Sequence, residues 1–439
     1  MLLMEKSSLL LILIGALLFV STLYIGSATM DSSCQNCNVI LISIDTLAPL
    51  HTSPYNPELD TMPFLKQIAQ ERGVVFEHAY AQAPWTLPSH TAMLTGKYPW
   101  DLGVWEFLDA VPLSADTLAE KLKHAGYRTA LFSNGSFVQK EWQFDQGFDE
   151  IHGSMAVRDW NDLPALFLEA GVWIASDTST TPYFAFIRPF EAHDPYRDGT
   201  HIGEIVAFNE GITDDKTTEE FQSAYRADLL LIDNALKDFV EKLETNGQMR
   251  DTLIIVTSDH GEEFGEHGTT GLHGTTVYEE SIHVPLIVFV PGVQAKRVAS
   301  SVETRSIPAT VLDLVGLPYT RTDIAPSLRA HLLGETNIDF TVQSRTRISR
   351  EELLRTIETA YKNVDQVIDG RIVPHERTVP YSGTYTEGVV HGTWKALRPI
   401  AGEVQLYNLA TDPKETRDLR GTNNIDMVRV NYLLSFLNL

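Results

Sequence analysis

Two separate stretches of the sequence hold residue types that bind divalent cations. In NVILISIDT an apolar run ends at the carboxylate of Asp45, and in TSDHGEEFGEHG the residues Asp259 and His260 stand side by side before a glycine that permits a tight turn. Two carboxylates and one imidazole suit Mn²⁺, Zn²⁺, Ca²⁺ or Mg²⁺, and the ligand set alone does not choose among these ions. We therefore expect Asp45, Asp259 and His260 to ligate a divalent metal ion, with an Asx turn or a helix cap as the alternative for Asp45.

A hydroxyl group that could act as a nucleophile stands at Thr86, in the stretch QAPWTLPSH. A threonine before Pro88 and Ser89 can cap a helix. Beside a bound cation the same hydroxyl can lose its proton near neutral pH, and a helix N-terminus helps to hold an anion. Thr86 therefore has two interpretations, a helix cap and a catalytic nucleophile that is also a further metal ligand, and one residue can fill both roles.

Histidines near these stretches could move protons or hold a substrate. His193, in RPFEAHDPY, follows a predicted buried strand and could donate a proton to a leaving oxygen. His90 and His273 could bind the anionic oxygens of a substrate or add a metal ligand. The glutamates of the second stretch are expected to be solvated or to support the ligands from outside: Glu262, Glu263 and Glu266.

Predicted strands and helices alternate along the chain that carries these residues. Continuous apolar runs such as NVILISI suit strands that are buried on both faces of a parallel sheet. Apolar residues at helical spacing predict helices, the longest over residues 221–243. This alternation predicts an α/β fold with a doubly wound, mostly parallel sheet. Ligands bind such sheets at the carboxyl ends of the strands, where we expect Asp45, His193 and Asp259 to meet.

The composition of the sequence changes near residue 320, where charged residues become frequent and long apolar strands disappear. HGTWKALRP and EVQLYNLATDP are typical of two strands of a hairpin, with helical segments on either side. We therefore expect a metal-dependent catalytic domain over residues 38–320 and a small α+β subdomain over residues 321–439.

The charge of the chain restricts its partners. The 439 residues carry a formal net charge of −24 at pH 7, with an isoelectric point near 4.9. An acidic surface repels phosphate backbones, so nucleic acid is not an expected partner. An anionic ester substrate would need a local positive centre, such as a metal ion.

The N-terminus has the pattern of a targeting segment. Lys6 precedes a nearly unbroken apolar run over residues 9–25, and small residues follow it. Residues 1–30 are therefore expected to be a signal peptide or a single membrane anchor, with a buried core helix as the alternative. The two cysteines, Cys34 and Cys37, are typical of a small disulfide in an exported protein. We expect an exported protein, either membrane-anchored or periplasmic or extracellular, which binds a membrane through the N-terminal segment if that segment is not cleaved.

Several of these motifs together resemble one enzyme family. NVILISIDT, WTLPSHTAMLTGKYP and TSDHGEEFGEHG are similar to the first metal segment, the nucleophile segment and the second metal segment of the sulfatase branch of the alkaline phosphatase superfamily. The likeness runs from about Asn38 to Pro318. It implies that family's α/β fold and a metal-dependent ester hydrolase or transferase, with Thr86 at the nucleophile position.

The departures from the family pattern bear on the chemistry. Sulfatases carry Cys or Ser in a Cys-x-Pro-Ser-Arg pattern and oxidise it to formylglycine, whose aldehyde hydrate expels sulfate by breaking a C–O bond. Here Thr86 and His90 stand at the first and last positions, and Thr46 replaces a metal Asp that many sulfatases have. Oxidised threonine would be a ketone, so a threonine sulfate ester lacks that exit. Thr86 with the Asp259–His260 pair is similar instead to phosphoethanolamine and phosphoglycerol transferases of cell envelopes.

Three hypotheses about function follow. The first is a metal-dependent hydrolase or transferase of phosphate monoesters or diesters that works through a covalent intermediate on Thr86, because water or an acceptor alcohol can attack phosphorus in a threonine phosphate ester. The second is a sulfuric ester hydrolase with chemistry that does not use formylglycine. The third is a non-catalytic binding module on the same fold.

Overall fold

The computed structural model describes residues 34–153, 162–177, 179–193, 196, 215–267, 273–320, 322, 324–347, 385–399, 402–420, 422 and 427–437. The expected targeting segment, residues 1–30, lies outside these ranges and stays a prediction. Among the described residues, no helix is long and apolar enough to span a membrane. Cys34 and Cys37 form the expected disulfide just before the first strand.

An eight-stranded sheet forms the centre of the molecule. In chain order its strands are β1 (Asn38–Ser43), β2 (Val74–Tyr80), β3 (Arg128–Ser133), β4 (Glu150–His152), β5 (Tyr183–Arg188), β6 (Thr252–Thr257), β7 (His283–Phe289) and β8 (Lys296–Glu303). In the sheet they lie in the order β4-β3-β5-β1-β6-β7-β2-β8. β7 runs antiparallel to both of its neighbours, and every other adjacent pair is parallel. The predicted doubly wound, mostly parallel α/β sheet is confirmed.

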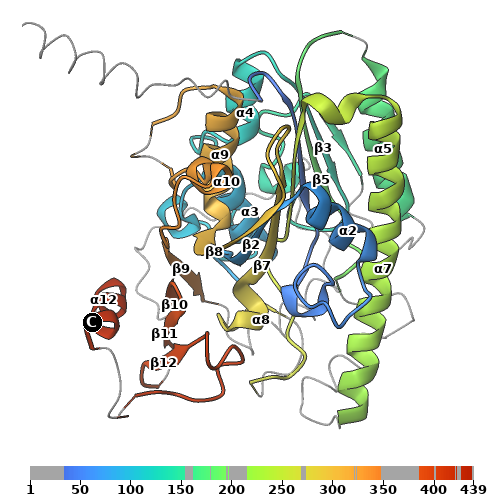
Figure 1. Cartoon of the computed structure of the whole chain (residues 1–439). Coiled ribbons are helices and arrows are strands. Elements are labelled where there is room, and N and C mark those ends of the chain that lie inside the picture. The colour runs from blue at the N-terminus through green and yellow to red at the C-terminus, as the bar shows by residue number, and fades with distance from the viewer. Residues whose placement is uncertain are drawn as a thin grey trace, which may run out of the picture.

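Helices cover both faces of this sheet (Figure 1). Successive residues of β1 point to opposite faces: Val39 and Leu41 belong to one apolar core, whereas Ile40 and Ile42 belong to the other. The first core lies under α3 (Thr86–Thr95), α4 (Leu118–His124) and α9 (Ile307–Val315), and the second under α2 (Pro63–Arg72), α5 (Asp162–Ser176) and α7 (Asp215–Thr245). Short helices α8 (Glu279–Ile282) and α10 (Arg329–Leu333) lie before β7 and after α9 in the chain. The helix predicted over residues 221–243 is the central part of α7.

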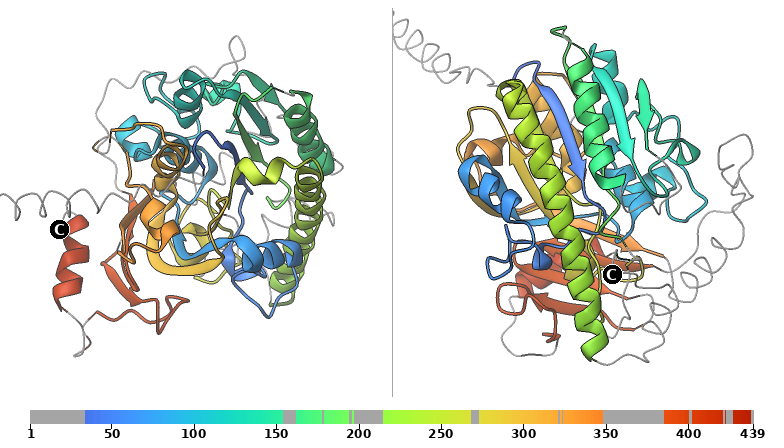
Figure 2. Two further views of the ribbon diagram at one scale, coloured as in Figure 1. Left: turned by 45° about the horizontal axis from the view of Figure 1, so that its top comes forward. Right: turned by 90° about the vertical axis from the view of Figure 1, so that its right-hand side faces the viewer.

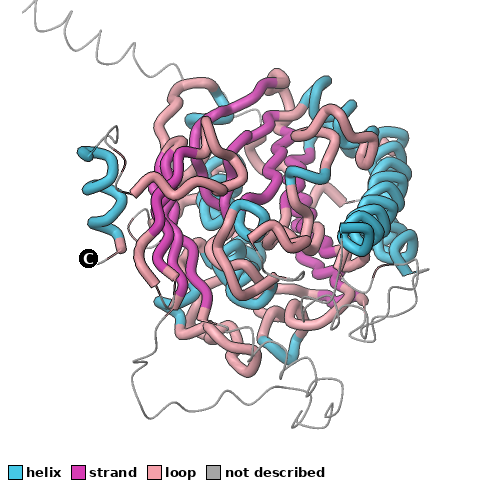
Figure 3. The backbone as a smooth tube through the Cα atoms, turned by 90° about the horizontal axis from the view of Figure 1, so that it is seen from below, coloured by secondary structure: helices cyan, strands magenta, loops and turns pink. Residues whose placement is uncertain are grey.

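A smaller antiparallel sheet follows the central one in the chain (Figure 2). It contains β9 (Thr341–Thr346), β10 (Thr386–His391), β11 (Trp394–Arg398) and β12 (Gln405–Asn408), and α12 (Met427–Phe436) packs on its outer face (Figure 3). β11 and β12 are the two strands of the predicted hairpin. The inner face shares an apolar cluster with the central sheet, in which Val390 and Leu397 lie with Tyr80. A small C-terminal α+β subdomain is therefore confirmed, whereas its boundary at residue 320 stays a prediction.

Asp233 of α7 caps the neighbouring helix α2. Its carboxylate oxygens accept hydrogen bonds from the backbone N–H groups of Phe64 (2.7 Å) and Leu65 (2.9 Å), which have no partner inside their own helix. Replacing Asp233 with alanine should lower the free energy of unfolding by about 1–3 kcal/mol, because these donors lose their acceptor. Urea denaturation measures the loss. Asp238→Ala, at an exposed position of α7, should change stability by less than about 0.5 kcal/mol, and equal losses in the two variants would contradict the capping role.

Candidate active site

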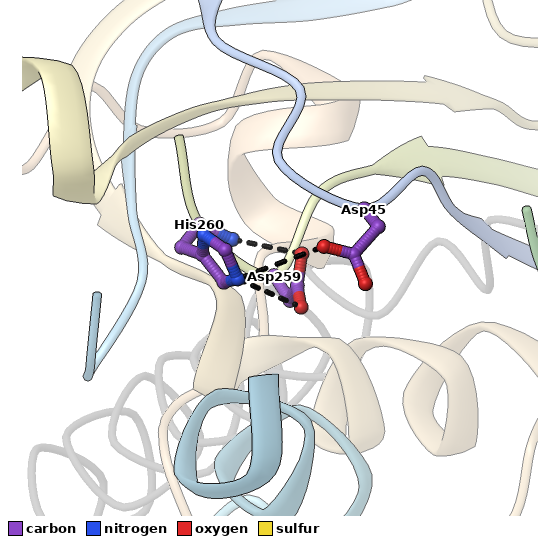
Figure 4. Close-up of side chains that lie close together, drawn as sticks. All are labelled: Asp45, Asp259 and His260. Carbon is purple, nitrogen blue, oxygen red and sulfur yellow. Dashed lines mark hydrogen bonds and ion pairs between the residues drawn. The ribbon is translucent and has the colours of Figure 1, made fainter. Parts of the chain in front are cut away.

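The predicted metal ligands meet at one edge of the central sheet. Asp45 follows β1, and Asp259 and His260 follow β6, which pairs with β1 in parallel. Figure 4 shows the three side chains pointing toward one another. The Nε2 atom of His260 lies 3.7 Å from Oδ1 of Asp45 and 3.4 Å from Oδ2 of Asp259, and all three side chains are fully buried. Their ligand atoms lie within 4.8 Å of one another, close enough to share one ion.

The hydrogen bonds of this cluster leave three electron-pair donors facing one another. Nδ1 of His260 lies 2.9 Å from the carbonyl oxygen of Gly261 and donates to it, so Nε2 presents a lone pair. Oδ1 of Asp45 and Oδ2 of Asp259 accept no hydrogen bond from the described residues. Buried carboxylate oxygens without donors are costly, and negative groups at these distances repel unless a cation lies between them. The donor set therefore fits a divalent cation held by Asp45, Asp259 and His260.

The ionisation of these side chains depends on burial and on a neighbouring arginine. Burial opposes the charge of Asp45, but the guanidinium of Arg188 and the nearby imidazoles outweigh it and lower the pKa of the Asp45 carboxyl. Burial and the charge of Asp45 raise the pKa of Asp259 to about 6. Burial lowers the pKa of His260 to about 4, so the imidazole is neutral at pH 7 and its lone pair is available to a metal ion.

Thr86 lies beside the cluster as the first residue of α3. Its Oγ1 atom is 3.3 Å from Nε2 of His260, and the side chain is buried. The interpretation of Thr86 as a helix cap is wrong, because Trp85 is the N-cap residue and no side chain caps this end of α3. The hydroxyl contacts the candidate metal ligand instead. It also lies at a helix N-terminus, where backbone N–H groups favour an anion.

His90 lies beside the cluster with protein partners at both ring nitrogens. The ring is fully buried, its Nδ1 lies 3.0 Å from the carbonyl oxygen of Thr86, and its Nε2 lies 3.0 Å from Oγ of Ser43. Nδ1 therefore donates to Thr86, and Nε2 accepts from Ser43. Burial lowers the pKa of His90 to about 4, which keeps the ring neutral. Both ring nitrogens are thus bonded within the protein, and His90 fixes the start of α3 against β1. Its predicted role as a substrate contact or metal ligand stays a prediction.

His193 and His273 lie next to the cluster, in the loops after β5 and β6. The ring centroid of His273 is 4.2 Å from that of His260, and the ring centroid of His193 is 4.9 Å from that of His273. Nδ1 of His273 lies 3.1 Å from Oε1 of Glu262. His273 is not part of the group of converging ligand atoms, so its position favours contact with a substrate over metal ligation. The predicted roles of both histidines stay predictions.

Glu262 is buried, as is Glu263, whereas Glu266 is exposed. Of the two expected alternatives, exposure to solvent therefore fits Glu266, and a supporting contact fits Glu262, which lies beside His273. Replacing Glu262 with glutamine should lower kcat/KM about tenfold, because the carboxylate that orients His273 loses its charge. Steady-state kinetics with an aryl phosphate measure the change. Glu266→Gln is the matched control in the same loop and should leave kcat/KM unchanged, and a similar loss in both variants would contradict the orienting role.

The site also contains a buried cation that the sequence motifs did not indicate. Arg188 ends β5, is fully buried, and pairs through Nη2 with Oδ2 of Asp45. Its Nη1 donates to the carbonyl oxygens of Asn134 and Ser136. The signal in the sequence was an arginine that closes the otherwise apolar strand YFAFIR, since a buried arginine requires a partner.

A second group of possible metal ligands lies near the small sheet and includes His267, Glu280 and Glu415. The ammonium of Lys395 is buried there, 3.0 Å from Oε1 of Glu415 and 3.1 Å from Oε1 of Glu279. This ammonium already supplies a positive charge to the group. We therefore assign the group to the contact between the two sheets and not to a metal site.

Comparison with known proteins agrees with the fold and the motifs. The family model described as Sulfatase matches residues 37–317. An ulvan-active sulfatase of Formosa agariphila is 24% identical over 409 residues, which cover 83% of this chain and 73% of that protein. The low-salt glycan biosynthesis sulfotransferase Agl7 of Haloferax volcanii is 27% identical over 240 residues, which cover 54% of each chain. The match thus spans only about half the length of the second relative.

A solved structure with the same architecture is the phosphonate monoester hydrolase of Agrobacterium radiobacter. It superposes with a TM-score of 0.70 at 18% sequence identity, over 92% of this chain and 95% of that chain. At this identity the likeness shows a shared fold and does not transfer an activity.

Proposed function

The chain belongs to the sulfatase family, and from the site of this member we propose a metal-dependent enzyme that hydrolyses or transfers phosphate esters through a covalent intermediate on Thr86. The observation that carries the proposal is the Thr86 hydroxyl, 3.3 Å from Nε2 of His260. It lies beside carboxylate oxygens of Asp45 and Asp259 that accept no hydrogen bond from the described part of the chain. A nucleophile next to a cation site is the arrangement that activates a hydroxyl group. Family membership supports a hydrolase or a transferase, and phosphorus as the reacting atom is our inference.

The identity of the nucleophile favours phosphate over sulfate. The Thr86 hydroxyl gives its proton to solvent, and Oγ1 attacks phosphorus. The bond from phosphorus to the leaving oxygen breaks, and the leaving oxygen takes a proton. Water or an acceptor alcohol then attacks phosphorus, and the bond from phosphorus to Oγ1 breaks. Each step exchanges one P–O bond for another and needs no oxidation of Thr86. A formylglycine route is closed to a secondary alcohol.

The proposed roles follow from the positions of the side chains. A divalent cation, which could be Mn²⁺, Zn²⁺, Ca²⁺ or Mg²⁺, would be held by Asp45, Asp259, His260 and the Thr86 oxygen, and would lower the pKa of that hydroxyl. His193 donates the proton to the leaving oxygen. The partly exposed ring of His273 holds an anionic oxygen of the substrate. The substrate is an anionic ester, and its organic part is set by loops that this site does not include.

A substrate panel tests this proposal. The purified protein, loaded in turn with each of the four ions, is assayed with aryl phosphate monoesters, aryl phosphate diesters and aryl sulfates. We expect turnover of a phosphate ester with at least one ion and none of the sulfates. Turnover of aryl sulfates alone would contradict the choice of phosphorus.

Sulfuric ester hydrolysis or sulfuryl transfer without formylglycine is the second candidate. The observation in its favour is the pair of curated relatives, which are named as a sulfatase and a sulfotransferase. Thr86 argues against it, because a threonine sulfate ester cannot release sulfate by breaking its C–O bond as formylglycine does. The same substrate panel separates the two candidates.

We also propose that the protein works outside the cytoplasm. The Cys34–Cys37 disulfide supports this location, because disulfides persist in oxidising compartments. Fractionation of the native host should place the protein in the membrane or outside the cytoplasm, and thiol labelling of intact cells should leave both cysteines unmodified. A cytoplasmic protein with both thiols free would contradict the location.

A further inference from the structure

Arg188 places a fixed positive charge inside the candidate active site. The guanidinium is fully buried, and its Nη2 pairs with Oδ2 of Asp45. The rings of His90 and His260 also pair with the carboxylates of Asp45 and Asp259. A guanidinium, unlike an imidazole, keeps its charge over the whole physiological pH range. Arg188 therefore supplies the permanent cation of this cluster.

The arginine also fixes the orientation of Asp45. The carbonyl oxygens of Asn134 and Ser136, in the loop after β3, accept hydrogen bonds from Nη1. The guanidinium therefore has a defined position between that loop and Asp45. Oδ2 of Asp45 is then occupied by Arg188. Oδ1 accepts no hydrogen bond from the described residues and faces Nε2 of His260 at 3.7 Å. Asp45 can thus offer one oxygen to a metal ion, and its other oxygen is not available to bridge a second ion.

The charges of the candidate metal ligands and of Arg188 show what the arginine contributes. Among the candidate metal ligands, Asp45 and Asp259 carry negative charges, and Arg188 cancels one of them. A divalent cation then leaves the ligands and Arg188 with a net positive charge of one, which matches a single alkoxide on Thr86. The same site without Arg188 would be neutral with the cation bound, and an alkoxide on Thr86 would make it negative. A negative site would repel an anionic ester.

We propose that Arg188 acts as a resident second cation: it occupies Oδ2 of Asp45, which leaves Oδ1 for a single exchangeable divalent cation, and it balances the charge of the Thr86 alkoxide. This proposal rests on the proposed function, because it assigns the alkoxide to Thr86. In the proposal, the side chain of Arg188 supplies the positive charge that a second metal ion would otherwise supply.

Calorimetric titration of the metal-free protein with Mn²⁺ and Zn²⁺ tests the proposal without relying on turnover. The wild type should bind one ion. Arg188→Met should bind the same ion at least about tenfold more tightly, because the guanidinium no longer repels it and the metal-free site has an unbalanced carboxylate. Its thermal midpoint should also rise more on adding the ion than that of the wild type.

Kinetics separate the charge of Arg188 from its packing. At a saturating ion concentration Arg188→Met should lose turnover, and the pH at which turnover rises should move upward, because the alkoxide is less stabilised. Arg188→Lys keeps the charge and should retain wild-type affinity with part of the turnover. Arg128→Met is the matched control, since Arg128 lies over the ring of Trp173 at the start of β3, outside the site, and should match the wild type in every titration.

The outcomes distinguish this proposal from the proposed function. Unchanged or weaker ion binding by Arg188→Met, or binding of two ions by the wild type, would overturn the role of Arg188. Failure of the wild type to bind any divalent ion would overturn the proposed function itself. If Arg188→Met does not fold, Arg188→Gln, which keeps a donor for Asp45 but lacks the charge, decides by the same titration: tighter binding supports the proposal and equal affinity contradicts it.

Discussion

Replacing Thr86 with alanine should abolish turnover of phosphate esters while the fold and the bound cation remain. The structure places the hydroxyl 3.3 Å from Nε2 of His260, so its removal takes away the attacking oxygen and leaves Asp45, Asp259 and His260 in place. We expect a loss on the order of a thousandfold or more in kcat, equivalent to roughly 4 kcal/mol or more of the barrier. Steady-state kinetics of the purified variant at full metal occupancy measure the loss.

Thr86→Ser is the matched comparison, because serine keeps an attacking oxygen at the same position and should retain measurable turnover. Stability should change little in either variant, since Trp85 and not Thr86 is the N-cap of α3. Near wild-type turnover in Thr86→Ala would show that the hydroxyl is not the nucleophile. A large loss of stability in the same variant would point to a structural role that its contacts do not suggest.

Replacing Asp259 with alanine should remove both the metal ion and the activity. Its Oδ2 atom lies 3.4 Å from Nε2 of His260 and is one of the oxygens that lack a donor among the described residues. Loss of a direct ligand should lower metal affinity by more than about 100-fold, the upper end of the effect for residues that only support ligands. Elemental analysis of the purified protein measures the metal content, and a chelator should inactivate the wild type in the same way.

Asp238→Ala provides the control, because it removes a carboxylate from an exposed position of α7. It should leave both the metal content and turnover at wild-type values. Full metal occupancy in Asp259→Ala would contradict the ligand assignment. Retained activity after complete removal of divalent ions would do the same.

Much of the fold and part of the site were predictable from local sequence patterns. Apolar runs that end in Asp45 or in Asp259–His260 mark strands of a parallel sheet, and parallel strands bring their carboxyl ends to one edge. The structure confirms the sheet and brings these side chains together with Thr86, as expected. The strand ends were predictable because each depended on one strand and the residue that follows it.

The environments of Arg188 and His90 could not be read from the sequence in this way. The contact between Arg188 and Asp45 requires β5 to lie next to β1, and strand order is a property of the whole sheet. Every residue of α3 is buried, so the helix has no polar face that would show on which side the ring of His90 lies. The burial of Glu262 depends on the loop that returns His273 to the site, which no periodic pattern indicates.

Mass spectrometry of the protein after a rapid quench tests the central claim most directly. The metal-loaded wild type is mixed with an aryl phosphate that turns over, quenched in acid, digested and analysed for modified peptides. The account predicts one added phosphoryl group on Thr86, which is absent from Thr86→Ala and disappears when the substrate is exhausted. An unmodified Thr86 during turnover that accumulates the leaving alcohol, or a phosphoryl group on another residue, would contradict it.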